Sequence, residues 1–260
     1  MRTFTSRIIY LLGSIPLLGD WLRRKASGYP EGSVVTIKRG GAAGMKFMRS
    51  HRHVNGYWMG IYEPEMQQAL SSCLRPGAVL YDIGANAGFF SLLAAKCVGA
   101  EGQVFAFEPD PKNAEAARAQ FKLNGLQNCH LVELAVGRET GMASFECAGS
   151  ESKFAEGKAE ACITIPVITL DDFLKDHRAP DVVKMDVEGA ELDAMLGGMK
   201  IFERDRPPVW LIELHGEKQA RGVWDILTKQ GYEITTIRGD KVISDNVPSH
   251  VMARKKRTGG

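Results

Sequence analysis

The sequence predicts a doubly wound α/β domain with a mostly parallel sheet. From residue 78 onward, short β-like runs alternate with longer helical stretches, and connections of this kind pair strands in parallel through right-handed crossovers. The chain has 260 residues, 44% of them hydrophobic and 25% charged, which supplies enough apolar material for one large core. Glycines and acidic residues follow several predicted strands, and ligands bind at this edge of such sheets.

The segment before the alternating region is expected to form an extension. Residues 34–40 and 43–50 are rich in β-formers and predict a two-stranded hairpin. Residues 62–74 predict a helix, because apolar residues recur at helical spacing up to a Pro-Gly stop. We therefore expect a helix and hairpin extension over residues 1–60, the main domain over 61–255 and a basic tail over 256–260.

The main domain alternates strand and helix in a regular order. Strands are expected at 78–84, 103–109, 130–137, 182–189 and 209–215. Helices are expected at 89–98, 113–125, 170–177, 190–203 and 222–231. Two β-like runs at 142–148 and 161–170 predict an inserted hairpin, and residues 232–237 and 249–254 predict a closing hairpin. One antiparallel edge strand is common on sheets of this type.

An apolar segment at residues 8–22 is flanked by basic residues. It is too short to cross a bilayer and is interrupted by Pro16 and Gly19, and it lacks a convincing signal-peptide cleavage site. Two interpretations remain open, a helix packed on the domain and an interfacial helix in peripheral contact with a membrane. The five cysteines form no C-x-x-C pair, which indicates a reducing, cytoplasmic compartment.

The first predicted strand runs into the glycine-bracketed turn of VLYDIGANAGFFS (79–91). Gly84 and Gly88 leave room for backbone N–H groups to approach a ligand. A dinucleotide fingerprint needs a glycine where Asn86 stands, and Asp82 would repel a pyrophosphate. An acid at that place suits an ammonium or sulfonium group instead, which favours S-adenosylmethionine over NAD. The alternative is a turn that is merely tight.

The second predicted strand ends at Glu108, about two dozen residues beyond the turn. An acid at this position can accept hydrogen bonds from both hydroxyls of a ribose. The alternative is an exposed acid ahead of the turn at Pro109.

The later strands also end in ionisable residues. Lys184 and Asp186 share one face of a strand, where a buried lysine is costly unless it is paired. Glu188 follows in the turn, and Glu213 and His215 share a face of the next strand. We expect these acids and His215 to converge as an active site, the alternative being an acidic rim that caps helix N-termini.

The motifs VLYDIGANAGFFS, FAFEPD, LNG…ELAVG, VITLDDF and KMDVEGAE follow in this order between about Tyr57 and about His215. Together they resemble the FkbM family of methyltransferases. The resemblance implies a class I methyltransferase (Rossmann-like) fold with a seven-stranded sheet. It also implies methyl transfer from S-adenosylmethionine, usually to a hydroxyl on a sugar, polyketide or lipid-linked acceptor, here a small molecule, glycan or lipid.

Site roles follow from the same resemblance. The implied cofactor-binding residues are Glu63, Asp82, Gly84, Asn86, Gly88, Glu108, Pro109, Glu133 and Ala135. Among these, Asp82, Gly84 and Gly88 would line the methionine end, Glu108 the ribose, and Glu133 and Ala135 the adenine. Tyr62 and Glu63 match a segment that folds over the cofactor. Asp186 and Glu188 would face the acceptor.

Methyl transfer to a hydroxyl needs an aligned acceptor and a group that removes its proton. His215 is the preferred base because an ordinary histidine pKa is about 6.5; Asp186 is the alternative base or the residue that orients His215. Asp186, Glu188 and Glu213 offer a third route, a Mg²⁺ site that lowers the pKa of the acceptor hydroxyl. The sequence does not choose among these routes.

Other assignments are weaker. His51 and His53 are spaced like metal ligands, but alternation in a hairpin explains them, and with Arg49, Arg52 and Tyr57 they are expected to line an acceptor pocket. An NAD-dependent oxidoreductase and a non-catalytic S-adenosylmethionine-binding scaffold remain alternatives. No nucleic-acid partner is expected, because the sequence of the domain carries no large basic face and no NPPY-like strand end for a flipped base.

Overall fold

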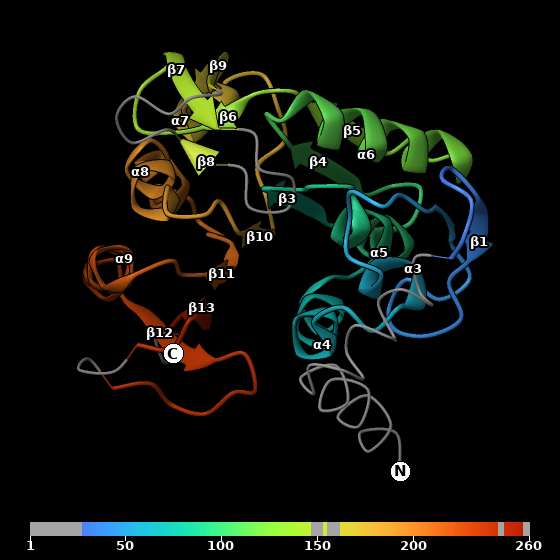
Figure 1. Ribbon diagram of the computed structural model, residues 1–260. Coiled ribbons are helices and arrows are strands. Elements are labelled where there is room, and N and C mark those ends of the chain that lie inside the picture. The colour runs from blue at the N-terminus through green and yellow to red at the C-terminus, as the bar shows by residue number, and fades with distance from the viewer. Residues whose placement is uncertain (1–27, 147–152, 155–161, 244–246, 257–260) are drawn as a thin grey trace, which may run out of the picture.

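The computed structural model describes residues 28–146, 153–154, 162–243 and 247–256 (Figure 1). Its centre is a seven-stranded sheet. In spatial order the strands are β12 (Tyr232–Thr236), β13 (His250–Lys255), β11 (Val209–Glu213), β10 (Val182–Met185), β3 (Val79–Ile83), β4 (Gln103–Phe107) and β5 (Cys129–Val132). Only β13 runs against the common direction, pairing antiparallel with both neighbours. The predicted class I, mostly parallel seven-stranded sheet is confirmed.

The closing hairpin suggested an antiparallel strand at the edge of the sheet. In the structure, the antiparallel strand β13 lies one position inside the edge. The chain leaves β11 through α9 (Glu217–Lys229) and returns as β12, two strand positions away. β13 then fills the gap and hydrogen-bonds to β11 on one side and β12 on the other. Both rows of its backbone N–H and C=O groups are thereby paired, which a buried strand requires.

Helices cover both faces of the sheet (Figure 1). One face packs on α4 (Pro64–Cys73), α5 (Phe89–Val98) and α6 (Pro111–Leu123). The other packs on α7 (Leu170–Phe173), α8 (Glu191–Leu196), a 3₁₀ helix (Met199–Glu203) and α9. Alternate residues of β3 enter the two cores, with Leu80 in the first and Tyr81 in the second. The period of two explains why this strand is apolar throughout and buried on both faces.

The predicted N-terminal hairpin is present as β1 (Val34–Thr36) and β2 (Lys46–Met48). It is held on α6 by two side-chain amides: Gln120 bonds the backbone of Met48, and Asn124 bonds the backbone of Lys46. A short helix, α3 (Gly56–Met59), then leads into α4. Four residues are too few to show a helical period, so the sequence did not predict α3.

The predicted inserted hairpin belongs to a small second sheet. Its strands are β6 (Ala135–Val136), β7 (Gly141–Glu146), β8 (Lys153–Phe154) and β9 (Cys162–Ile168), in the order β6-β9-β7-β8. The expected strand at 130–137 is therefore two strands, β5 in the large sheet and β6 in the small one. The expected helix at 190–203 is likewise divided at Gly197, where a side chain would meet the backbone oxygen of Gly137 at 2.0 Å.

The apolar segment 8–22 and residues 257–260 of the basic tail lie outside the described residues. In the part of the chain that the structure describes, no helix combines the length and apolarity needed to cross a membrane.

Candidate functional site

A cavity opens at the carboxyl ends of the central strands, where the strand order reverses between β3 and β10. This is the switch point at which sheets of this type bind ligands. Its lining comes from five places: the turn after β3, the ends of β4, β10 and β11, and an aromatic wall. The polar and aromatic lining residues include Tyr57, Tyr62, Asn86, Phe89, Phe90, Glu108, Asn113, Lys184, Asp186, Glu188 and Glu213.

The turn after β3 is fixed by backbone contacts. The backbone N–H groups of Gly84 and Ala85 both donate to the carbonyl oxygen of Phe107, at 3.0 and 2.9 Å. Gly84 has φ +80°, and a side chain there would meet the Asp186 backbone oxygen at 1.8 Å. Only glycine fits this position. Asn86 also adopts a left-handed conformation, φ 49°, and lines the cavity.

Gly88 lies at the contact between α5 and α6, away from Asp186. A side chain on it would meet the Phe121 ring at 3.0 Å, so it allows α5 and α6 to approach each other. Gly88 is not among the residues that line the cavity. Both bracketing glycines thus allow close packing, and Gly84 also lines the cavity.

Glu108 is buried at the end of β4 and lines the cavity beside Pro109. Its two carboxylate oxygens accept hydrogen bonds from the backbone N–H groups of Asn86, at 2.7 Å, and Asp110, at 2.8 Å. Burial raises the pKa of Glu108 to about 7 despite these hydrogen bonds. The Asn113 side chain also hydrogen-bonds to Glu108. A carboxylate offers about four lone-pair sites, so acceptor capacity remains for a ligand hydroxyl such as one of a ribose.

Asp82 lies beneath the turn and does not line the cavity, contrary to its expected contact with a ligand. Its side chain is fully buried and accepts a hydrogen bond from the Ser91 hydroxyl at 2.6 Å. Lys184 lies between two carboxylates, 3.7 Å from Asp82 and 3.6 Å from Asp186. The predicted pairing of Lys184 with Asp186 is confirmed. Lys184 itself lines the cavity and is shared between the two carboxylates.

The acids at the ends of β10 and β11 converge on His215. Its Nε2 lies 3.3 Å from Glu188, 3.8 Å from Glu213 and 3.9 Å from Asp186. Its Nδ1 is 2.8 Å from a carboxylate oxygen of the fully buried Glu191. The predicted convergence is confirmed, and the structure adds Glu191. The only sequence signal for Glu191 was its place at the end of KMDVEGAE.

The surroundings of His215 change its expected role. The hydrogen bond to Glu191 and the charge of Glu188 raise the pKa of His215 to about 9, against the opposing effect of burial. The imidazole is therefore protonated near neutral pH and has no free lone pair with which to take a proton. His215 also does not line the cavity, whereas Asp186 does. Burial raises the pKa of Asp186 above that of an ordinary aspartate.

Besides Asp82 and Gly88, two more of the expected cofactor residues, Glu133 and Glu63, lie outside this cavity. Glu133 is exposed and forms an ion pair with Arg118, while its neighbours Leu134 and Ala135 line the cavity. Its position between β5 and β6, where the chain changes sheets, turns its side chain outward. Glu63 precedes α4 with a left-handed φ of 40° and lines a neighbouring cavity.

His51 and His53 lie beyond β2, in a turn and not in the hairpin as expected, and each contacts a partner of its own. His51 lies 3.3 Å from Glu31, and His53 is hydrogen-bonded to Asn113. Arg52 contacts Asp110 at 2.7 Å. Of the expected acceptor-pocket residues in this segment, Tyr57 lines the cavity, stacked on Phe89.

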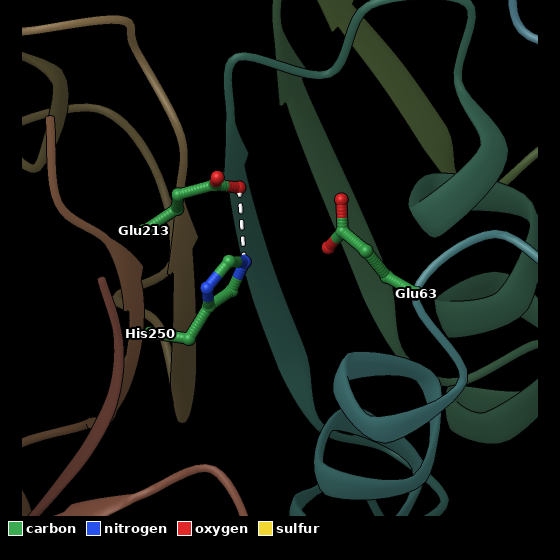
Figure 2. A group of neighbouring side chains, drawn as sticks. All are labelled: Glu63, Glu213 and His250. Carbon is green, nitrogen blue, oxygen red and sulfur yellow. Dashed lines mark ion pairs between the residues drawn. The ribbon is translucent and has the colours of Figure 1, made fainter. Parts of the chain in front are cut away.

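The expected metal ligands Asp186, Glu188 and Glu213 belong to two separate groups of side chains. Within each group, the donor atoms lie within 4.8 Å of one another. The first group is Asp186, Glu188 and His215. The second is Glu63, Glu213 and His250, shown in Figure 2. His250 was not predicted: it stands at the start of β13, and the register of β13 with β11 places it opposite Glu213.

Comparison with known proteins finds methyltransferases with similar sequences. The sequence profile of the Methyltransferase FkbM domain matches residues 82–234. The 2-O-methyltransferase NoeI of Sinorhizobium fredii is 27% identical over 165 residues, 54% of this chain and 65% of that protein. The hexuronic acid methyltransferase AglP of Haloferax volcanii is 27% identical over 176 residues, 63% of this chain and 67% of that protein. The chain thus spans about two thirds of the length of these curated relatives.

Among solved structures, the methyltransferase FkbM of Methylobacillus flagellatus resembles the chain with a TM-score of 0.48 and 18% identity. The similarity covers 77% of this chain and 55% of that one. The domain match extends over more than half of the sequence and includes the turn after β3 and the ends of β4, β10 and β11. The chain belongs to the FkbM methyltransferase family.

Proposed function

We propose that the chain transfers a methyl group from S-adenosylmethionine to a hydroxyl of a sugar or glycan acceptor. Membership of a methyltransferase family supports the cofactor, and the names of NoeI and AglP support a carbohydrate acceptor. The observation that carries the proposal is the shared cavity. Glu108 and the Gly84–Asn86 turn line it together with Asp186 and Glu188, so a nucleoside-holding carboxylate and a pair of possible acceptor contacts meet in one space.

The lining suits S-adenosylmethionine in both charge and shape. Glu108 would accept hydrogen bonds from the ribose hydroxyls, and Leu134 and Ala135 would contact the adenine. Carboxylates around the other end of the cavity would stabilise a cation, whereas the pyrophosphate of NAD would be repelled by them. When bound, S-adenosylmethionine would supply a methyl group already attached to a good leaving group, its sulfonium sulfur.

The residues of the chain then have to hold the acceptor hydroxyl and take its proton. We assign the proton to the Asp186 carboxylate, which lines the cavity and whose pKa is raised by burial. A carboxylate with a raised pKa is a stronger base than one in water. Protonated His215 would keep Glu188 ionised and in place. Two of the expected Mg²⁺ ligands already have cationic neighbours, Lys184 beside Asp186 and His215 beside Glu188, so we route no step through Mg²⁺ there.

The test is a turnover assay with isotopically labelled S-adenosylmethionine. Purified protein is incubated with uronic acids, neutral hexoses and their glycosides, and the assay follows S-adenosylhomocysteine and methylated sugar. We expect both products in equal amounts with at least one acceptor. Binding without S-adenosylhomocysteine release across the whole acceptor set would favour the scaffold alternative. Binding of reduced nicotinamide cofactor in place of S-adenosylmethionine, measured by its fluorescence, would favour the oxidoreductase.

We further propose that residues 8–22 bring the enzyme to a membrane surface, which would suit a lipid-linked acceptor. The support is the sequence alone, an apolar segment with basic flanks. The full chain should co-sediment with vesicles rich in anionic lipid, and a chain beginning at Gly28 should not. Equal sedimentation of the two forms would refute the membrane proposal.

A further inference from the structure

Glu63, Glu213 and His250 come from three separate parts of the chain and meet at the edge of the sheet. Glu63 precedes α4, Glu213 ends β11 and His250 begins β13. Their donor atoms lie within 4.8 Å of one another, and the His250 Nε2 is 3.2 Å from a Glu213 oxygen. In Figure 2, the Glu63 carboxylate faces this pair from the opposite side.

The charge of this group is not balanced from within. Among the described residues, no basic side chain lies within ion-pair distance of Glu63; its carboxylate has a hydrogen bond from the Tyr62 hydroxyl. Burial raises the pKa of Glu63, and the charges of Glu213 and Asp186 add to this, against the opposing effects of the Tyr62 hydrogen bond and the more distant Lys184 charge. The group therefore holds two carboxylates against one imidazole. A half-buried carboxylate with no ion-pair partner is partly desolvated, which favours a cation or a proton beside it.

The neighbouring group of Asp186, Glu188 and His215 differs in this respect. Lys184 lies 3.6 Å from Asp186, and His215 lies 3.3 Å from Glu188. Both carboxylates thus already have a cationic partner within the protein. The Nδ1 of His215 is also committed to Glu191. A metal ion bound there would be stabilised less by these carboxylates than an ion bound beside Glu63.

We propose that Glu63, Glu213 and His250 bind a divalent first-row transition-metal ion such as Mn²⁺, Co²⁺ or Zn²⁺. An imidazole with two carboxylates is a donor set that these ions accept, whereas Mg²⁺ prefers oxygen ligands. The outer contacts fit. The Tyr62 hydroxyl donates to Glu63, and the Ser249 hydroxyl lies 3.0 Å from the His250 Nδ1. The His250 Nε2 faces Glu213 at 3.2 Å, and an ion would replace the proton between them.

The position of the group suggests what the ion does. Glu213 lines the cofactor cavity, while Glu63 and His250 line a neighbouring cavity with Thr236, Arg238 and Ser249. An ion between them would contact a ligand that enters from the second cavity and would lower the pKa of its hydroxyl. This role in methyl transfer rests on the proposed function, whereas binding of the ion does not.

The test is a Co²⁺ titration of the full-length protein, without cofactor or acceptor, after removal of bound metal with a chelator. Visible d–d absorption reports Co²⁺ coordination, and calorimetry with Mn²⁺ gives the stoichiometry. We expect one site. In His250→Ala and in Glu63→Gln, the affinity for Co²⁺ should fall by more than the about 10–100-fold that loss of an outer contact causes. His215→Ala is the matched control and should keep the site. Each variant is checked for an unchanged melting temperature in the absence of metal.

Three results would overturn the proposal. One is that the wild-type protein binds none of the three ions. Another is that Co²⁺ binding survives in folded His250→Ala or in folded Glu63→Gln. The third is that binding is lost in His215→Ala and kept in His250→Ala, which would place the ion in the other group. Methyl transfer that persists in the presence of a chelator would contradict a role of the ion in the reaction while supporting the proposed function.

Discussion

The Glu108 carboxylate accepts a hydrogen bond from the backbone N–H of Asn86 at 2.7 Å. One side chain at the end of β4 thereby fixes the turn that follows β3. The second carboxylate oxygen is held by the Asp110 N–H at 2.8 Å, so the carboxylate cannot rotate away from the cavity. A ligand that hydrogen-bonds to Glu108 meets an acceptor that is already oriented, which reduces the entropy lost on binding.

Replacing Glu108 by alanine should weaken the binding of S-adenosylmethionine by about 1.5–3 kcal/mol, the range for lost hydrogen bonds to a charged group. Glu133→Ala is the control, because that side chain is exposed and paired with Arg118. It should leave the affinity unchanged. Calorimetry on both variants tests the assignment, and an equal loss in Glu133→Ala would show that the cofactor extends to a region that the structure places outside the cavity.

The affinity for S-adenosylmethionine should depend on pH through Glu108. Its pKa is raised to about 7 in the free protein, and ligand hydroxyls that donate to it favour the ionised form, so its pKa should fall on binding. The affinity should therefore rise as the pH increases toward about 7 and be level above it, and should fall on acidification below about 7 by up to about tenfold per unit. Calorimetry in buffers of different ionisation enthalpy would detect the released proton. Glu108→Gln should show neither effect; a wild-type affinity that is constant with pH contradicts the assignment.

Asp186→Asn should lower turnover by about 10²–10⁴-fold, the usual contribution of a general base, while leaving cofactor affinity nearly intact. His215→Ala should have a smaller effect, because protonated His215 positions the acids and does not take the proton. Asp193→Asn removes a surface acid that pairs with Arg138 and serves as the control. If Asp186→Asn keeps normal turnover on a true acceptor, the base lies elsewhere.

The double variant of Asp186 and His215 distinguishes a shared unit from independent contributions. If His215 acts through Asp186 and Glu188, the double variant should be little slower than Asp186→Asn alone. Multiplied losses in the double variant would instead mean that His215 acts on the acceptor separately.

Gly84→Ala should destabilise the fold far more than an ordinary glycine replacement. Its side chain would lie 1.8 Å from the backbone oxygen of Asp186, so two strand ends would have to separate. Gly125 has a similar φ, +63°, and open space around it, and Gly125→Ala should cost only about 1–2 kcal/mol of unfolding free energy. Urea unfolding should show a loss above about 4 kcal/mol for Gly84→Ala. Similar losses in the two variants would contradict the predicted steric clash.

Local pattern predicted the parts of the site that belong to one strand and its following turn. These parts are the glycine turn after β3, Glu108 after β4 and the Lys184–Asp186 pair at the end of β10. Alternation along the strand and the order of the strands decide where they lie. Glu191 and His250 were not predicted. Each meets its partner only across the packed structure, Glu191 from the first turn of α8 and His250 from a strand that the chain adds last.

The sequence by itself determined the fold class, the family and the edge of the sheet that carries the chemistry. Apolar runs of strand length separated by helices admit few topologies, and the strand-end motifs repeat that order. Tertiary structure alone decided the charges within the site. Whether His215 is protonated depends on the distance to Glu191, and whether Glu133 meets the cavity depends on where the chain leaves β5. Electrostatic interactions follow separation and burial in space, and neither quantity is encoded in spacing along the chain.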